Sequence, residues 1–192
     1  AFEAIYYGAV GWPATVPDHV SLWGSLILFR RQFDQYVNLR PCKLMPGIPS
    51  PLANRKPGDI DFVVVRENTE GLYSGVENEV TEGVIMSMKV ATRVACHRIA
   101  HWTFRYATRR GRETISAFHK ANIMKMTDGL FLRCAREIHD KEFPEIEYQE
   151  LIIDAGCMRL VQDPTRFDVL LLENLYGDVV SDLAAGLVGG LG

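Results

Sequence analysis

Residues 167–188 read FDVLLLENLYGDVVSDLAAGLV and join a short apolar run to a segment rich in small residues. The apolar run over residues 167–172 predicts a buried strand. Residues 177–188 are predicted to form a helix. A strand that leads directly into a helix is the repeating unit of α/β proteins. This stretch therefore predicts the fold class.

Strand and helix patterns alternate along the rest of the chain as well. Strands are predicted at residues 1–8, 36–44, 62–65, 114–118 and 146–153, and helices at residues 20–33, 92–108 and 125–140. Residues 41–57 are rich in proline, which predicts a loop or an extended edge. Residues 80–90 are predicted to form an irregular strand or arm. The alternation supports an α/β class for the whole chain.

Composition excludes several classes of function. The 192 residues are 47% hydrophobic, enough to bury a sizeable core, and carry a formal net charge of -3. No overall basic field is available to hold nucleic acid or an anionic membrane. The sequence has no apolar run of about 18 residues, so no membrane-spanning helix is predicted. We expect a globular protein whose partner is a small molecule.

The four cysteines indicate a reducing compartment. Cys42, Cys96, Cys134 and Cys157 form no C-x-x-C pair, which favours free thiols over disulfides or a zinc site. We therefore expect a cytoplasmic protein. The chain opens on an apolar strand pattern without a cap and closes in a glycine-rich turn, so we also expect a central segment of a longer protein.

Asp178 and Asp182 lie four residues apart at the predicted start of the last helix. This spacing turns both carboxylates to one side of a helix. Two such oxygen ligands suit Mg²⁺ or Mn²⁺, which prefer octahedral oxygen coordination completed by water and substrate. The simpler interpretation is that the pair caps the helix and complements its dipole.

Arg30, Arg40 and Arg66 are the candidate carboxylate-binding residues, because each lies in or beside a predicted helix or strand that would fix it. The alternative for any one of them is an ion pair with a neighbouring acid such as Asp34 or Glu67.

Lys120 and Tyr73 are the candidate proton-transfer residues. Lys120 follows a predicted strand, where the carboxyl end of an α/β sheet usually meets its ligand. A tyrosine such as Tyr73 can donate a proton, although most lysines are solvated and most tyrosines pack. His97 and His101 have the spacing of a zinc helix but lack the glutamate of H-E-x-x-H, so we expect no metal there.

Several motifs, in order along nearly the whole chain, resemble those of the β-decarboxylating dehydrogenases, the family of isocitrate and isopropylmalate dehydrogenases. The motifs are GAVGWP at residues 8–13, NLRP at 38–41, VVVRENTEGLY at 63–73, HKAN at 119–122, IIDAGCM at 152–158 and ENLYGDVVSDL at 173–183. The resemblance implies oxidative decarboxylation of a small 2-hydroxy dicarboxylate with NAD and Mg²⁺ or Mn²⁺.

The resemblance also implies a role for each candidate residue. Arg30, Arg40 and Arg66 would bind the substrate carboxylates, Tyr73 and Lys120 would transfer protons, Asp154, Asp178 and Asp182 would bind the metal, and Asn122, Asn68 and Glu70 would contact the cofactor. In the family, Lys120 and Asp154 would reach into the active site of the partner subunit. We therefore expect a homodimer with shared active sites.

The resemblance implies a three-layer, isopropylmalate-dehydrogenase-like fold. Residues 1–35 would be part of the large cofactor domain, residues 36–189 the small domain with the dimer interface and an arm, and residues 190–192 a return to the large domain. Two alternatives remain open within this fold. One is a noncatalytic regulatory subunit, although the catalytic residue types are all present, and the other is an inactive fragment.

Substrate choice in the family lies on the helix before Arg30, where this chain has Trp23 and Leu26. Those residues resemble the tartrate and D-malate dehydrogenases, and they leave no partner for a third carboxylate. Later motifs, such as HKANIMKMTDGLF at residues 119–131, are more similar to NAD-linked isocitrate dehydrogenases. We expect a tartrate or D-malate type of substrate, with isocitrate or 3-isopropylmalate as the alternative.

Overall fold

The computed structural model describes residues 3–8, 11–12 and 14–190. The chain divides into two compact units, Ala1–Gln35 and Tyr36–Gly192. The assignment of these units to the two domains of the family stays a prediction. The predicted return at residues 190–192 falls mostly outside the described residues.

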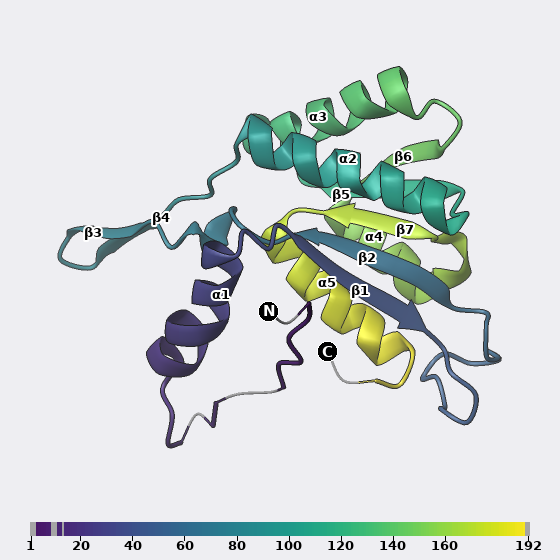
Figure 1. The fold of residues 1–192 in the computed structure, drawn as a ribbon, viewed down its shortest axis with the longest axis horizontal. Coiled ribbons are helices and arrows are strands. Elements are labelled where there is room, and N and C mark those ends of the chain that lie inside the picture. The colour runs from purple at the N-terminus through teal and green to yellow at the C-terminus, as the bar shows by residue number, and fades with distance from the viewer. Residues whose placement is uncertain (1–2, 9–10, 13, 191–192) are drawn as a thin grey trace. The chain divides into compact units, whose positions relative to one another are not determined.

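The described part of the first unit contains one helical stretch, a π-helical segment η1 (His19–Leu26) that continues into α1 (Ile27–Gln32) (Figure 1). The helix predicted at residues 20–33 is confirmed. The strand predicted at residues 1–8 is wrong for residues 3–8, which are exposed and extend without strand pairing. A strand needs a neighbour for its backbone N–H and C=O groups, and an apolar run alone does not show that such a neighbour exists.

The second unit is built on a five-stranded sheet in the order β1-β2-β7-β5-β6. Strands β2, β7, β5 and β6 are parallel, and β1 pairs antiparallel with β2 at one edge (Figure 1). The strands are β1 (Val37–Lys43), β2 (Asp61–Glu67), β5 (Thr114–His119), β6 (Glu147–Ile152) and β7 (Val169–Leu172). All five were predicted from the sequence.

Helices cover both faces of the sheet, which gives the predicted three layers. Side chains alternate along β2, so Val63 and Val65 pack into one core and Phe62 and Val64 into the other. The first core is closed by α2 (Arg93–Arg110) and α3 (Thr127–Glu142), and the second by α4 (Ile153–Gln162) and α5 (Asn174–Leu187). Burial on both faces explains why β2 and β7 are continuous apolar runs.

Helix α4 is not predicted from the sequence, whose pattern indicates a strand that continues to residue 153. β6 ends at Ile152 and α4 begins at Ile153, so no polar turn separates them in the sequence. Gly156 lets α4 approach the sheet, because a Cβ there would lie 2.5 Å from the Phe118 ring.

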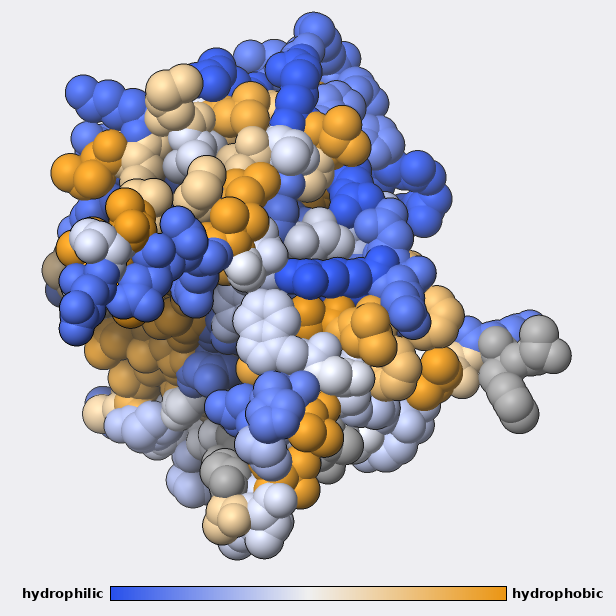
Figure 2. All heavy atoms as spheres, turned by 90° about the vertical axis from the view of Figure 1, so that its left-hand side faces the viewer, coloured by the Kyte–Doolittle hydropathy of each residue, from blue (hydrophilic) through white to orange (hydrophobic). Residues whose placement is uncertain are grey.

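The predicted arm at residues 80–90 is a hairpin of β3 (Glu77–Thr81) and β4 (Val84–Ser87). All its strand residues are exposed, and it extends away from the sheet of its unit (Figure 1). Figure 2 faces this side of the molecule and shows hydrophobic side chains among the charged ones. The exposed apolar residues of the hairpin include Val80, Val84, Ile85 and Met86.

The four parallel strands end at the same edge of the sheet, here called the carboxyl edge. β2 ends at Arg66 and Glu67, Glu173 follows β7, Lys120 follows β5, and Asp154 follows β6. Ligands of open α/β sheets bind at this edge. Within the part of the chain that the structure describes, no helix is long and apolar enough to cross a membrane.

Candidate active site

Helix α5 is capped by Glu173, whose carboxylate accepts the N–H groups of Leu175 and Tyr176 at 3.2 and 3.0 Å. The helix therefore begins at Asn174, earlier than the predicted residue 177. Asp178 and Asp182 lie in its second and third turns, so the interpretation that they cap the helix is wrong. Both face the same neighbour, Arg40, as their spacing predicted.

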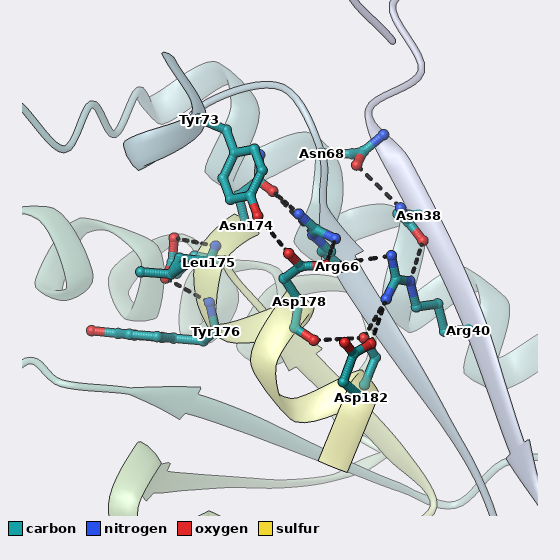
Figure 3. Close-up of polar contacts among 12 residues, drawn as sticks. Asn38, Arg40, Arg66, Asn68, Tyr73, Asn174, Leu175, Tyr176, Asp178 and Asp182 are labelled. Atoms are coloured by element: carbon teal, nitrogen blue, oxygen red, sulfur yellow. Dashed lines mark hydrogen bonds and ion pairs between the residues drawn. The ribbon is translucent and has the colours of Figure 1, made fainter. Parts of the chain in front are cut away.

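Arg66 is held almost completely buried at the end of β2, with 1% of its surface exposed. Its Nε and Nη2 donate to Asn174 Oδ1 at 3.0 and 2.7 Å, and its Nη1 donates to the Asp178 carboxylate (Figure 3). Burial lowers the pKa of Arg66, and the charge of Asp178 opposes that shift. The alternative ion pair with Glu67 is wrong, because the Glu67 carboxylate accepts hydrogen bonds from Thr69 and Glu70.

Arg40 reaches the same group of side chains from the neighbouring strand β1. Its guanidinium nitrogens lie 3.5 Å from carboxylate oxygens of both Asp178 and Asp182. Its Nε donates to Asn38 at 3.1 Å, and Asn38 in turn donates to Asn68 at 3.2 Å (Figure 3). Two arginines and two aspartates from three elements therefore converge.

Tyr73 completes this cluster from the short 3₁₀ turn Leu72–Ser74. Its phenol donates to the second carboxylate oxygen of Asp178, and its ring lies 5.0 Å from the Arg66 guanidinium (Figure 3). Burial raises the pKa of Tyr73, and the Asp178 carboxylate adds to the rise. The phenol therefore keeps its proton at neutral pH. We call Arg40, Arg66, Tyr73, Asp178 and Asp182 the arginine cluster.

Lys120 and Asp154 form a second group farther along the carboxyl edge, here called the lysine pair. Lys120 Nζ lies 2.6 Å from Asp154 Oδ1, and 29% and 69% of the two side chains are exposed. The hydrogen bond from Lys120 holds the pKa of Asp154 below its usual value. The two residues follow the adjacent strands β5 and β6.

One chain does not bring all three predicted metal ligands together. Asp178 pairs with Arg66 on β2, and Asp154 follows β6. Strands β7 and β5 lie between β2 and β6, so β2 and β6 are about 14 Å apart at ~4.8 Å per strand. Within the described ranges, no three His, Cys, Asp or Glu side chains form a group that would hold a metal ion. Asp178 and Asp182 share a neighbour, whereas Asp154 pairs with Lys120 instead.

The other predicted site residues lie in three places. Asn68 accepts a hydrogen bond from Asn38 beside the arginine cluster. Glu70 accepts the N–H of Thr92 at 2.8 Å, and burial raises its pKa. Asn122 is exposed on the turn after Lys120.

Arg30, Trp23 and Leu26 all lie on the helical stretch of the first unit. Trp23 is 44% exposed, and the Arg31 guanidinium lies 5.6 Å from the centre of its ring. Leu26 and Arg30 are half-buried. The three residues thus share one continuous helical stretch, η1 and α1, as the sequence predicted.

Two further residues, which the sequence did not single out, fix the arginine cluster. Asn174 is 1% exposed and orients Arg66, and Asn38 orients Arg40. The sequence signal for Asn174 is an amide two residues after an apolar strand, where a buried polar side chain needs a specific partner.

Comparison with known proteins identifies the family of this chain. Residues 1–192 match the isocitrate/isopropylmalate dehydrogenase family. The chain is 49% identical to a D-malate dehydrogenase (decarboxylating) of Escherichia coli, over 100% of this chain and 54% of that protein. It is 52% identical to the mitochondrial isocitrate dehydrogenase (NAD) catalytic subunit 5 of Arabidopsis thaliana, over 86% of this chain and 43% of that protein.

A crystal structure of isocitrate dehydrogenase from Methylococcus capsulatus has the same fold, with a TM-score of 0.79 and 43% identity over 85% of this chain and 48% of that one. The chain therefore belongs to the isocitrate/isopropylmalate dehydrogenase family. It spans about half the length of the curated relatives described here, 54% and 43%.

Proposed function

We propose that this chain is the central part of an NAD- and divalent-metal-dependent dehydrogenase that oxidises and decarboxylates a small 2-hydroxy dicarboxylate. The observation that carries the proposal is the convergence of Arg40, Arg66, Tyr73, Asp178 and Asp182 at the carboxyl edge. This reaction requires guanidinium groups to bind the substrate, carboxylates to bind the metal and a protonated phenol to donate a proton.

Arg40 and Arg66 would bind the carboxylates of the substrate. A guanidinium presents two parallel N–H groups that match a carboxylate. Asn174 and Asn38 already hold the two guanidinium groups in place, so little side-chain entropy is lost on binding. Arg30, on the helix of the first unit, is proposed as the third such residue.

Asp178 and Asp182 fit a divalent cation. Arg40 lies 3.5 Å from an oxygen of each, which means that one cationic group reaches both carboxylates. When bound, Mg²⁺ or Mn²⁺ would acidify the substrate hydroxyl and stabilise the enolate left by CO₂, and NAD⁺ would accept the hydride. Asn68, Glu70 and Asn122 are proposed to contact the cofactor.

Lys120 and Tyr73 would move the protons. The Lys120 amine would take the proton of the hydroxyl group during oxidation, and Tyr73 would return a proton to carbon after CO₂ leaves. The raised pKa of Tyr73 supports this donor role, because a donor must still hold its proton when the enolate forms.

The lysine pair would act in the active site of a second subunit. Each chain would supply its arginine cluster, and Lys120 and Asp154 of the partner subunit would complete the site. Two facts support this: the pair is exposed and several strands away from Asp178, and the β3–β4 hairpin exposes apolar side chains that a second copy would cover.

The two compact units would belong to different domains. Ala1–Gln35 would be part of the large cofactor domain, and the unit from residue 36 to about residue 189 would be the small domain with the arm and the dimer interface. The chain's match to about half of its relatives' length supports this division, because the remaining length would supply the other part of the cofactor domain.

Trp23 and Leu26 support a D-malate or tartrate type of substrate. An apolar Leu26 offers no hydrogen bond to a third carboxylate, and burying an unpaired carboxylate costs on the order of several kcal/mol. The D-malate dehydrogenase also matches the whole chain, whereas the isocitrate dehydrogenase of Arabidopsis thaliana matches 86% of it. Isocitrate and 3-isopropylmalate are the alternatives.

The proposed function is tested by NADH production in the full-length protein with Mn²⁺ and D-malate, tartrate, isocitrate or 3-isopropylmalate. We expect the highest kcat/KM for D-malate or tartrate. The double variant Gly24→Ser, Leu26→Asn should shift preference toward isocitrate, because it adds hydrogen-bonding groups where the third carboxylate would lie. A higher kcat/KM for isocitrate in the unaltered protein would contradict the assignment, and no NADH with any of the four would overturn the proposed function.

A further inference from the structure

Lys89 is a nearly buried lysine that the proposed mechanism does not use. It follows the β3–β4 hairpin, and its side chain is 13% exposed. Its Nζ lies 2.6 Å from Asp128 Oδ1, 3.6 Å from Glu173 Oε1 and 4.5 Å from the centre of the Tyr176 ring. A buried ammonium group is costly unless anions surround it, and two buried carboxylates flank this one.

The first carboxylate, Asp128, holds the backbone of the candidate catalytic lysine. Asp128 lies in the first turn of α3 and is 2% exposed. Its Oδ2 accepts the N–H of Lys120 at 2.7 Å, while its Oδ1 faces Lys89. The orientation of the turn after β5 therefore depends on a carboxylate that Lys89 neutralises.

The second carboxylate, Glu173, holds the start of the helix that carries Asp178 and Asp182. It caps α5 by accepting two N–H groups. It also lies close to the loop that leads to Tyr73, because a Cβ added at Gly71 would lie 3.0 Å from Glu173 Oε2. Burial raises the pKa of Glu173, and the positive charge of Lys89, whose Nζ lies 3.6 Å from Glu173 Oε1, opposes that rise.

We infer that Lys89 is a positioning residue whose ammonium group ties together the two carboxylates that orient Lys120 and helix α5. This inference rests on the proposed function for the role of Lys120 and the aspartates. Without the ammonium group, Asp128 and Glu173 would be two buried carboxylates without their shared cation. Their side chains would shift, and each movement would displace a group that the reaction needs within a fraction of an ångström.

The chain offers a matched control at the opposite edge of the sheet. Arg112 also joins two carboxylates, with Nη2 2.6 Å from Asp61 and Nη1 2.8 Å from Asp168, and its side chain is 23% exposed. These residues lie where β2 and β7 begin, far from the carboxyl edge. Arg112→Met also removes a cation shared by two carboxylates, so it should destabilise the fold. It should not displace the groups at the carboxyl edge.

The experiment compares Lys89→Met, Lys89→Arg and Arg112→Met in the full-length protein. Steady-state kcat and thermal unfolding are measured for each, together with hydrogen exchange of the Lys120 N–H. We expect Lys89→Met to lower kcat by about 10- to 100-fold, as is typical when an orienting partner is lost, and to speed exchange of the Lys120 N–H. Lys89→Arg keeps the positive charge, so its kcat and its Lys120 N–H exchange rate should be close to those of the unaltered protein. In Arg112→Met, kcat and the exchange rate of the Lys120 N–H should stay within about twofold of the values for the unaltered protein, even if its Tm falls.

Equal kcat and equal Lys120 exchange in Lys89→Met and Arg112→Met would overturn the inference, because Lys89 would then contribute stability alone. If Lys89→Met does not fold, Lys89→Gln is measured in its place with the same expectations. A protein that makes no NADH in its unaltered form would contradict the proposed function instead. The exchange measurement would still decide whether Lys89 holds the turn that carries Lys120.

Discussion

Lys120→Met should lower the kcat of the full-length protein by roughly 10²–10⁴-fold, the usual contribution of a general acid or base. Methionine keeps the length and apolar stem of lysine but has no group that accepts a proton. The Lys120 amine also pairs with Asp154 at 2.6 Å, but that pair is exposed and contributes little to stability. NADH production at saturating substrate measures the loss, and Tm should change by only a few degrees.

Lys141→Met is the control for this experiment. Lys141 pairs with Glu137 at 3.0 Å on the surface of α3, with 68% of its side chain exposed. Its loss removes an exposed lysine from an ion pair without touching the carboxyl edge, so kcat should stay near that of the unaltered protein. If Lys120→Met retained a similar kcat, Lys120 would not be the base.

Gly177→Ala should be the second most damaging change, because α5 and Arg66 meet at this glycine. A Cβ at position 177 would lie 2.4 Å from Arg66 Cγ and 2.6 Å from its Cβ. Either the helix or the buried arginine must move. We expect a loss of about 1–3 kcal/mol of stability from overpacking. We also expect kcat/KM to fall by about 10- to 100-fold as the carboxylate contact of Arg66 is misplaced.

Gly186→Ala in the same helix separates this clash from a general effect of glycine replacement. No heavy atom lies within 4 Å of the Cβ that alanine would add there, and residue 186 is exposed. Alanine should raise the free energy of unfolding by up to ~1 kcal/mol through its helix propensity, without changing kcat/KM. The account of Arg66 would be wrong if Gly177→Ala behaved like Gly186→Ala in denaturant melts and in kinetics.

Strands buried on both faces were the elements most readily predicted from the sequence. β2 and β7 are short apolar runs with polar ends, and that pattern has few other interpretations. α4 was missed because Ile152 and Ile153 continue an apolar run across the boundary. The strand predicted for residues 1–8 is wrong over the described residues 3–8, because apolar residues alone do not pair; a strand also needs a neighbour.

The candidate site was predicted in part. The four-residue spacing predicted that Asp178 and Asp182 face one neighbour. It also placed them at the start of the helix, where Glu173 is the actual cap. The roles of Asn174 and Lys89 depend on contacts between distant segments, such as Arg66 with Asn174 and Lys89 with Asp128. No periodicity in the sequence encodes such contacts, so only the fold reveals them.

The pairing of Lys120 with Asp154 follows from topology. β5 and β6 are neighbours in the sheet and end at the same level, with His119 beside Ile152. The residues after the two strands therefore meet, although 34 positions separate them in the sequence. Strand order, which the sequence analysis did not predict, is what separates this pair from Asp178.

The central claim is that the arginine cluster of one chain and the lysine pair of its partner form one catalytic site. Coexpression of Lys120→Met chains with Asp178→Asn chains tests it directly, because a mixed dimer with shared sites has one site with both defects and one with neither. Each variant alone should be nearly inactive, and the mixture should produce NADH at a substantial fraction of the unaltered rate. A mixture no more active than the two separate variants would contradict the account.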